Sequence, residues 1–224
     1  MIVLACQPAP PVKPNPFGLL DDNGKSTSKT MKISTLFLQR YDPLYHNYLA
    51  GYWKHVSYEL MRQRPQPRVN SIAWNLWHIA RCEDAGLNRF VVDGSQVLDD
   101  GDWMEQMKLP WRHHGSGMSS ADVDELDQRI DLSALQEYSQ AVQERTRAMI
   151  KTLEMDDLDE GMDEARLRQI MVKDGLAHSQ AEGFIKNYLG WSKGKCLLTF
   201  GLTHSWQHVG EMEVIASLLG VEFK

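Results

Sequence analysis

The chain is poor in cysteine. Its 224 residues include 3, namely Cys6, Cys82 and Cys196, which are odd in number and widely scattered. No Cys-x-x-Cys pair occurs, so the sequence shows no disulfide framework. Scattered thiols are typical of a reducing compartment, and we therefore expect a cytoplasmic protein.

Long hydrophobic runs and blocks of basic charge are also missing. No apolar run approaches the roughly 18–20 residues of a membrane span. Lys plus Arg total 24 against 30 for Asp plus Glu, and the formal net charge is -6. An acidic chain without a basic block binds nucleic acid and anionic membranes poorly. We therefore expect neither nucleic acid nor a membrane as a partner.

The first part of the chain lacks a periodic apolar face. Residues 1–30 are rich in proline and then in small polar residues, a composition typical of a linker. We expect a disordered or linker-like tail over 1–30 and one folded domain over 31–224, beginning at Met31. The hydrophobic fraction of 42% is ordinary for a globular protein and is enough for a full core.

Strand-like alternation persists nowhere, and helical periodicity takes its place. Apolar residues at spacings of three and four predict long helices over Pro43–Arg62, from Ser71 to about Asp93, over Leu132–Leu153 and over Lys195–Leu219. The second is apolar over more than half its circumference, which indicates a heavily buried helix. Four long helices predict an all-α four-helix bundle.

The segments between these helices are less regular. Gly94–Ser120 is rich in glycine and is expected to pack over the core as a long loop. It carries His113 and His114, which we interpret as loop residues because adjacent side chains rarely converge on one metal ion. Shorter helices are expected over Asp163–Val172 and Glu182–Leu189.

Two histidines lie four residues apart on the apolar stripe of the last predicted helix. His204 and His208 therefore project in nearly the same direction, one turn apart, and can bind one metal ion from the same side. Most such pairs are surface residues, and the spacing alone leaves the ligand number unmet. Their place on the buried stripe favours a partner, because an unpaired buried polar group costs about 1–3 kcal/mol.

The buried second helix contributes His78 and, one turn later on the same face, Cys82. From spacing alone, His78 is a core histidine that is hydrogen-bonded to a neighbour. Cys82 is a further ligand, a reactive thiol or a small apolar filler, and the filler is the commonest of these outcomes. His46, His55 and His178 have no partner at ligand spacing.

The segment Leu76-Trp77-His78-Ile79-Ala80-Arg81-Cys82-Glu83-Asp84, followed far downstream by His204-x3-His208, resembles the DinB/YfiT-like superfamily. The resemblance covers about residues 40–220. It implies a four-helix bundle of unusual connectivity in which three histidines bind one divalent metal ion, commonly zinc or nickel, with iron as an alternative. By position, the implied ligands are His78, His204 and His208.

The resemblance also implies an activity. Characterised members of the family include metal-dependent S-transferases that use low-molecular-weight thiols such as mycothiol, bacillithiol and glutathione, and a maleylpyruvate isomerase. We therefore expect a small-molecule substrate and either S-transfer with such a thiol or hydrolysis by a metal-bound water. A related domain in sulfoxide synthases carries His-x3-His-x-Glu. Here Glu211 follows His208 with two residues between, so that role is not expected.

Further candidates lie near the implied ligands. Glu211 faces roughly the same way as His208 and is a candidate for proton handling or for orienting an imidazole, with a surface glutamate as the alternative. Trp74, Cys82 and Trp206 are candidate pocket residues, with simple core packing as the alternative. Two other hypotheses stay open: a stress-related protein that binds a metal or small molecule without catalysis, and a structural homodimer whose histidines form only a buried hydrogen-bonded cluster.

Overall fold

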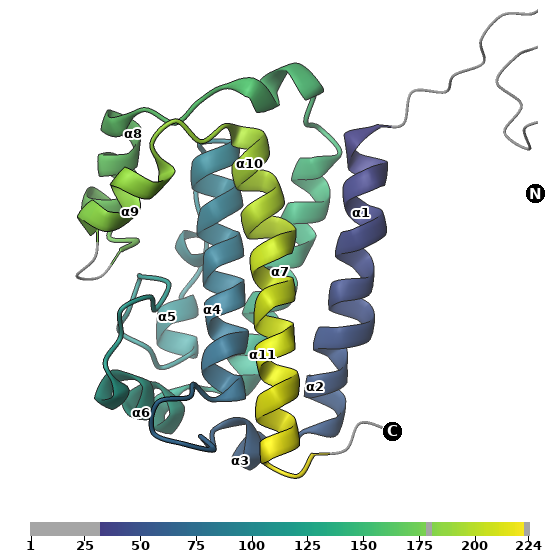
Figure 1. Ribbon diagram of the computed structural model, residues 1–224, viewed down its shortest axis with the longest axis vertical. Helices are drawn as coiled ribbons and strands as arrows, with labels where there is room; N and C mark the ends of the chain where they lie inside the picture. The colour runs from purple at the N-terminus through teal and green to yellow at the C-terminus, as the bar shows by residue number, and fades with distance from the viewer. Residues whose placement is uncertain (1–31, 178–180, 222–224) are drawn as a thin grey trace, which may run out of the picture. The chain divides into compact units, whose positions relative to one another are not determined.

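Helices dominate the described part of the chain, which in this computed structural model comprises residues 32–177 and 181–221 (Figure 1). No strand occurs within these ranges, where a single isolated bridge pairs Gly161 with Ser192. The all-α class is therefore confirmed. The predicted domain start at Met31, the tail over 1–30 and His178 lie outside the described residues.

Four long helical runs build the bundle, and three of them include a π-helical turn. The first run comprises α1 (Ile33–Pro43), η1 (Leu44–Leu49) and α2 (Ala50–His55). The second comprises α4 (Ile72–Ala85) and η2 (Gly86–Val91), and the third is α7 (Leu132–Ile150). The fourth comprises α10 (Lys193–Leu198), η6 (Thr199–Thr203) and α11 (His204–Leu218).

Shorter elements cover the connections. Between the first and third runs lie α3 (Tyr58–Met61), η3 (Val97–Asp99), α5 (Trp103–Gln106) and α6 (Ser120–Arg129). Before the fourth run lie η4 (Met155–Asp159), α8 (Glu164–Arg168), η5 (Gln169–Lys173) and α9 (Ala181–Tyr188). The short helices expected over Asp163–Val172 and Glu182–Leu189 are therefore present. In contrast, α6 was not among the predicted helices, nor were η3 and α5, which lie within the predicted loop Gly94–Ser120.

The first run differs from the predicted helix over Pro43–Arg62 at both ends. It begins ten residues earlier, at Ile33, and Pro43 lies where α1 passes into the π-helical turn η1. It ends at His55 because Val56 is extended, with φ -106° and ψ 128°. Ser57 then starts α3 as its N-cap by accepting from the Leu60 N–H at 3.2 Å.

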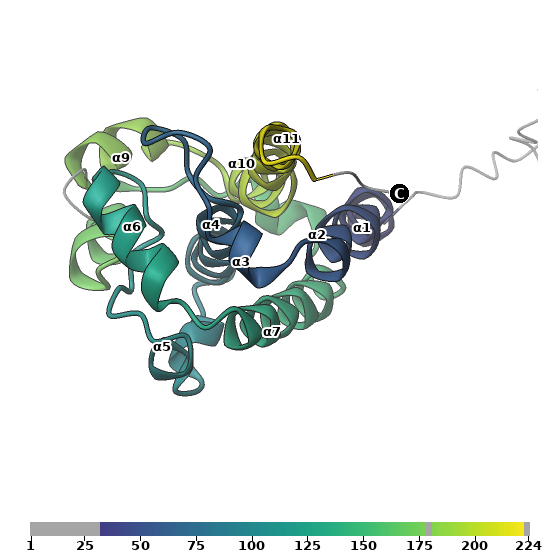
Figure 2. The ribbon, with the colours of Figure 1, turned by 90° about the horizontal axis from the view of Figure 1, so that it is seen from below.

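Helix α4 is the centre of the fold. In the view along the helices, α4 lies between α7 and α10–α11 on one side and α6 and α9 on the other (Figure 2). Every residue of α4 is buried, in agreement with the heavily buried helix predicted from a sequence that is apolar over more than half its circumference. Ser71 caps its start by accepting from the Trp74 N–H at 2.9 Å. A polar side chain on α4 must therefore find its partner within the protein.

The second and fourth runs approach closely just before the two C-terminal histidines. A Cβ atom at Gly86 would lie 2.3 Å from Phe200 Cγ, and one at Gly201 would lie 2.7 Å from the Phe37 ring. Neither position has room for a side chain. Gly86 therefore permits the contact between η2 and η6, and Gly201 permits the contact between η6 and α1.

Candidate metal centre

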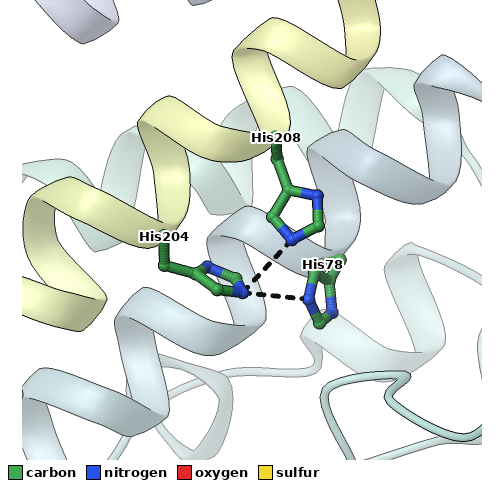
Figure 3. Close-up of side chains that lie close together, drawn as sticks. All are labelled: His78, His204 and His208. Atoms are coloured by element: carbon green, nitrogen blue, oxygen red, sulfur yellow. Dashed lines mark hydrogen bonds between the residues drawn. The ribbon is translucent and has the colours of Figure 1, made fainter.

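Three imidazoles converge between α4 and α11 (Figure 3). His204 Nε2 lies 3.2 Å from His78 Nε2 and 3.2 Å from His208 Nε2. Metal–nitrogen bonds of about 2.0 Å in a tetrahedral site place two ligand atoms about 3.3 Å apart. Both measured spacings agree with that geometry. His78 is 126 positions from His204 in the sequence and His208 is 4 positions from it, yet the three side chains meet at one point.

In two of these rings, the hydrogen-bond partner of Nδ1 determines which ring nitrogen carries the hydrogen. His78 Nδ1 lies against the backbone carbonyl of His114, which can only accept. His208 Nδ1 lies 2.8 Å from Glu211 Oε2 and 2.9 Å from Asn75 Oδ1. The Asn75 amide donates in turn to the Ser71 carbonyl at 2.9 Å, which orients its oxygen toward His208. Both Nδ1 atoms therefore donate, and both Nε2 atoms present a lone pair.

The three Nε2 atoms that face one another therefore carry too few hydrogens for each of them to be hydrogen-bonded. A single hydrogen on His204 Nε2 can satisfy one of its two neighbours but not both, while His204 Nδ1 is buried without a hydrogen-bond partner. A cation between the three Nε2 atoms satisfies all of them at once. The residues therefore fit a divalent metal ion, and the outer contacts of His78 and His208 are those that usually orient metal-binding histidines.

Burial keeps the ligand nitrogens available. Burial, followed by the neighbouring imidazoles, lowers the pKa of His78 well below its usual range and lowers the pKa of His204 to about 3. Both rings are therefore neutral at pH 7, the form that binds a metal. Trp74 stacks on His78 with ring centroids 4.5 Å apart and so supports the site.

Glu211 and the other sequence candidates occupy distinct places. The Glu211 side chain is 44% exposed, so it reaches His208 from the solvent side. Trp206 packs on Tyr48 with centroids 4.8 Å apart and lies under the Arg40 guanidinium, so the structure does not bring it to the three histidines. Cys82 does reach the site, with Sγ 3.7 Å from His78 Nε2.

A fourth histidine lies at the site, although the sequence identified it only as a loop residue. A ring nitrogen of His114 lies within 4.8 Å of Cys82 Sγ and of a His78 nitrogen. Burial raises the pKa of Cys82 to about 12, which makes the thiol a poor nucleophile at neutral pH, and burial lowers the pKa of His114 to about 3. His113 instead packs against Trp77, so only one residue of the adjacent pair reaches the centre.

Buried polar contacts hold the His114 loop onto α4. Arg81 donates to the Arg112 carbonyl at 2.6 Å and to Gln96 Oε1 at 2.8 Å. Asp84 accepts from the backbone N–H groups of Val97 and Leu98 at 2.8 and 3.0 Å. Both residues belong to the segment that carries His78. Their role here is to place the loop, and no spacing in the sequence indicated which loop residue they would bring to His78.

A cavity of about 80 Å³ adjoins the histidines. His204, His114 and Cys82 line it together with Phe90, Tyr188 and Phe200. A water molecule needs roughly 10–15 Å³ by this kind of measure, so the cavity holds more than one water. A small molecule could therefore lie beside His204.

Comparisons with known proteins agree with this fold. The model of the DinB superfamily matches residues 46–212. A crystal structure described as a conserved protein from Enterococcus faecalis is similar, with a TM-score of 0.63 and 13% identity; the match covers 84% of this chain and 98% of that chain. At this identity the likeness shows the fold alone. No curated protein matches the chain. Among the described helices, none has the length and hydropathy needed to cross a membrane.

Proposed function

The chain belongs to the DinB superfamily, and from this premise we propose that it is a divalent-metal-dependent enzyme that acts on a small molecule. Membership and the histidine cluster indicate a metal-binding helical protein. We propose His78, His204 and His208 as the ligands, zinc or nickel as the metal with iron as an alternative, and S-transfer with a low-molecular-weight thiol as the reaction.

The observation that carries this proposal is the convergence of three Nε2 atoms, with two spacings of 3.2 Å, around one point. Structural zinc sites usually have four protein ligands, whereas catalytic sites usually have three and an open position. Cys82 does not complete a fourth position around the same point, because the group within 4.8 Å that contains it is His78, Cys82 and His114. The site therefore supports catalysis better than a structural role.

The protein's own groups prepare the site. A divalent ion held there would supply a Lewis acid, which lowers the pKa of a thiol or a water molecule at its open position. The His114 carbonyl holds the His78 ring, while Asn75 and Glu211 hold the His208 ring. His204 has no such partner on Nδ1 and is the ligand that borders the cavity. The cavity therefore favours a substrate that approaches from the His204 side.

The first experiment measures metal content by elemental analysis after loading with zinc or nickel. We expect about one metal ion per wild-type chain, and loss of that ion in His78→Ala, His204→Ala and His208→Ala. His55→Ala is the matched control, because His55 is exposed and belongs to neither group of described residues that could hold a metal ion. A wild-type protein that takes up no metal, or a His55 variant that loses it equally, would contradict the site.

Activity is then tested on the loaded protein with a low-molecular-weight thiol and an alkylating electrophile, and separately with simple esters. Thiol consumption that disappears in His204→Ala supports S-transfer. Ester cleavage without thiol consumption would replace S-transfer by hydrolysis. A tightly bound metal with no turnover of either substrate class would leave a binding protein without catalysis.

A further inference from the structure

The cavity beside His204 has a shape and a chemistry of its own. We propose that it binds the reacting part of the substrate, and that this part is a small uncharged group with one hydrogen-bond acceptor that His114 recognises. The inference rests on the proposed function only in stating that the bound group is the one on which the metal centre acts. The occupancy of the cavity itself is independent of that premise.

Its volume limits the size of the group. The cavity measures about 80 Å³. An apolar cavity of about 150 Å³ binds benzene, which has six non-hydrogen atoms, so a cavity of roughly half that volume accommodates about three to four. A carbonyl or alkene group with two short substituents is of this size, whereas an aromatic ring is too large.

Its walls determine the polarity of the group. Phe90, Tyr188 and Phe200 pack on one another, with ring centroids between 5.5 and 5.9 Å apart, and Met171 and Leu176 extend this apolar surface. Among the described residues that line the cavity, none is Asp, Glu, Lys or Arg. Apart from a metal ion held by the three histidines, the cavity therefore offers a charged group no partner of opposite charge, which is strongly unfavourable.

His114 supplies a hydrogen-bond donor to this surface. Its Nδ1 accepts from the Ser116 backbone N–H at 3.3 Å, which leaves Nε2 to carry the hydrogen of the neutral ring. The ring lines the cavity, and a ring nitrogen lies within 4.8 Å of Cys82 Sγ. His204 lines the same cavity, so a carbonyl oxygen that accepts from His114 lies in the cavity that the proposed metal ligand borders.

The test compares two small probes of nearly equal shape, acetone and isobutene, with the metal-free protein and again with the metal-loaded protein. Binding is measured by NMR from the methyl group of Met171, which lines the cavity, in protein with labelled methionine methyls. We expect both probes to shift the Met171 signal in the wild type. In His114→Phe, which keeps a ring but removes the donor, we expect acetone binding to weaken about three- to tenfold while isobutene binding is unchanged.

A matched pair of variants tests the size limit. Leu176 and Leu167 are both buried, but only Leu176 lines the cavity among the described residues. We expect benzene to bind Leu176→Ala and to leave the wild type and Leu167→Ala unchanged. Equal benzene binding by both variants would overturn the assignment of the cavity.

The wild type alone keeps the inference testable if a variant fails to fold. No shift of Met171 by either probe at saturating concentration would overturn the proposal, as would equal weakening of both probes in His114→Phe. Probe binding by a protein that takes up no metal would preserve the cavity assignment and reject the proposed function. Metal uptake without probe binding would do the reverse.

Discussion

Helix α4 carries two buried polar clusters on different faces, and they differ in how they are completed. Toward α1 and α7, Glu83 accepts hydrogen bonds from the hydroxyls of Tyr41 and Tyr45 and from Thr146 Oγ1 at 2.7 Å. Toward α11, the imidazole of His78 meets those of His204 and His208 with too few hydrogens among them. The Glu83 cluster is closed within the protein, whereas the histidine cluster needs an external ion.

This difference separates a structural cluster from a functional one. Both clusters are buried, and both belong to the same stretch of sequence, so burial and proximity do not distinguish them. Satisfied buried networks rigidify a core, whereas unsatisfied groups require an explanation such as an ion or a ligand. We therefore expect changes in the Glu83 cluster to affect stability, and changes in the histidine cluster to affect metal binding.

The largest expected effect is the loss of folding stability when the Glu83 cluster is disrupted. Glu83→Ala removes the acceptor of three buried hydroxyls and leaves a cavity, so we expect the free energy of unfolding to fall by about 3–5 kcal/mol. Denaturant unfolding of the metal-free protein measures this loss. Glu137→Ala on the exposed face of α7 is the control and is expected to change little. Loss of metal binding from a folded Glu83→Ala protein would break the comparison.

The pH dependence of stability tests the same carboxyl group. Burial raises the pKa of Glu83 to about 7 from 4.5, despite its three hydrogen-bond donors. The folded protein therefore holds this proton at pH values where the unfolded chain has lost it. As pH rises from about 4.5 to 7, we expect wild type to lose about 3 kcal/mol of stability relative to Glu83→Gln.

The variant Glu83→Gln cannot titrate at this position, so the difference isolates Glu83 from other buried groups such as Asp127, whose pKa is also raised. The measurement is urea unfolding of both proteins across this pH range. A difference that stays constant or grows with pH would show that Glu83 is ionised in the folded protein.

Metal addition tests the histidine cluster in the same comparison. A metal ion at a free concentration about 100 times its Kd stabilises the folded state by about 2.7 kcal/mol. We expect this gain in wild type and in folded Glu83→Gln, its reversal by a chelator, and its absence in His204→Ala. Thermal unfolding with and without metal measures it. An equal gain in His204→Ala would place the metal elsewhere.

The smallest expected effect concerns Glu211, whose carboxylate contacts the histidine cluster at His208. Glu211→Gln weakens the acceptor that orients His208, so we expect about a tenfold loss of metal affinity, at the lower end for such groups because Asn75 still accepts from the same nitrogen. Competition with a chelating dye measures the affinity. Glu213→Gln, also exposed on α11, is the matched control and should leave affinity unchanged.

Much of the fold could be predicted because the information is local. A buried stripe at spacings of three and four requires only one helix, so the long helices and the relation of His204 to His208 followed from periodicity. The ends of the first run did not follow in this way. Pro43 is tolerated at the start of a π-helical turn, and the break at Val56 depends on backbone geometry that no apolar spacing indicates.

The candidate site shows the same limit. His78 on spacing alone was a core histidine, and only its likeness to a family motif indicated a ligand. His114 was interpreted as a loop residue because adjacent histidines rarely bind one metal ion. That rule holds for the pair, but it does not say whether one member alone reaches the site. Its place beside His78 depends on Arg81 and Asp84, which bind the backbone of a loop 13 or more residues away.

The sequence by itself determined the all-α class, the buried character of α4 and the pairing of two histidines one turn apart, because each is a property of one helix. Only the tertiary structure decided that His78 meets this pair, which ring nitrogens carry hydrogen, and that His114 and Cys82 border a cavity beside them. Those features arise where α4, α11 and the loop that carries His114 pack together. Contacts between residues far apart in the chain depend on that packing, which no local pattern encodes.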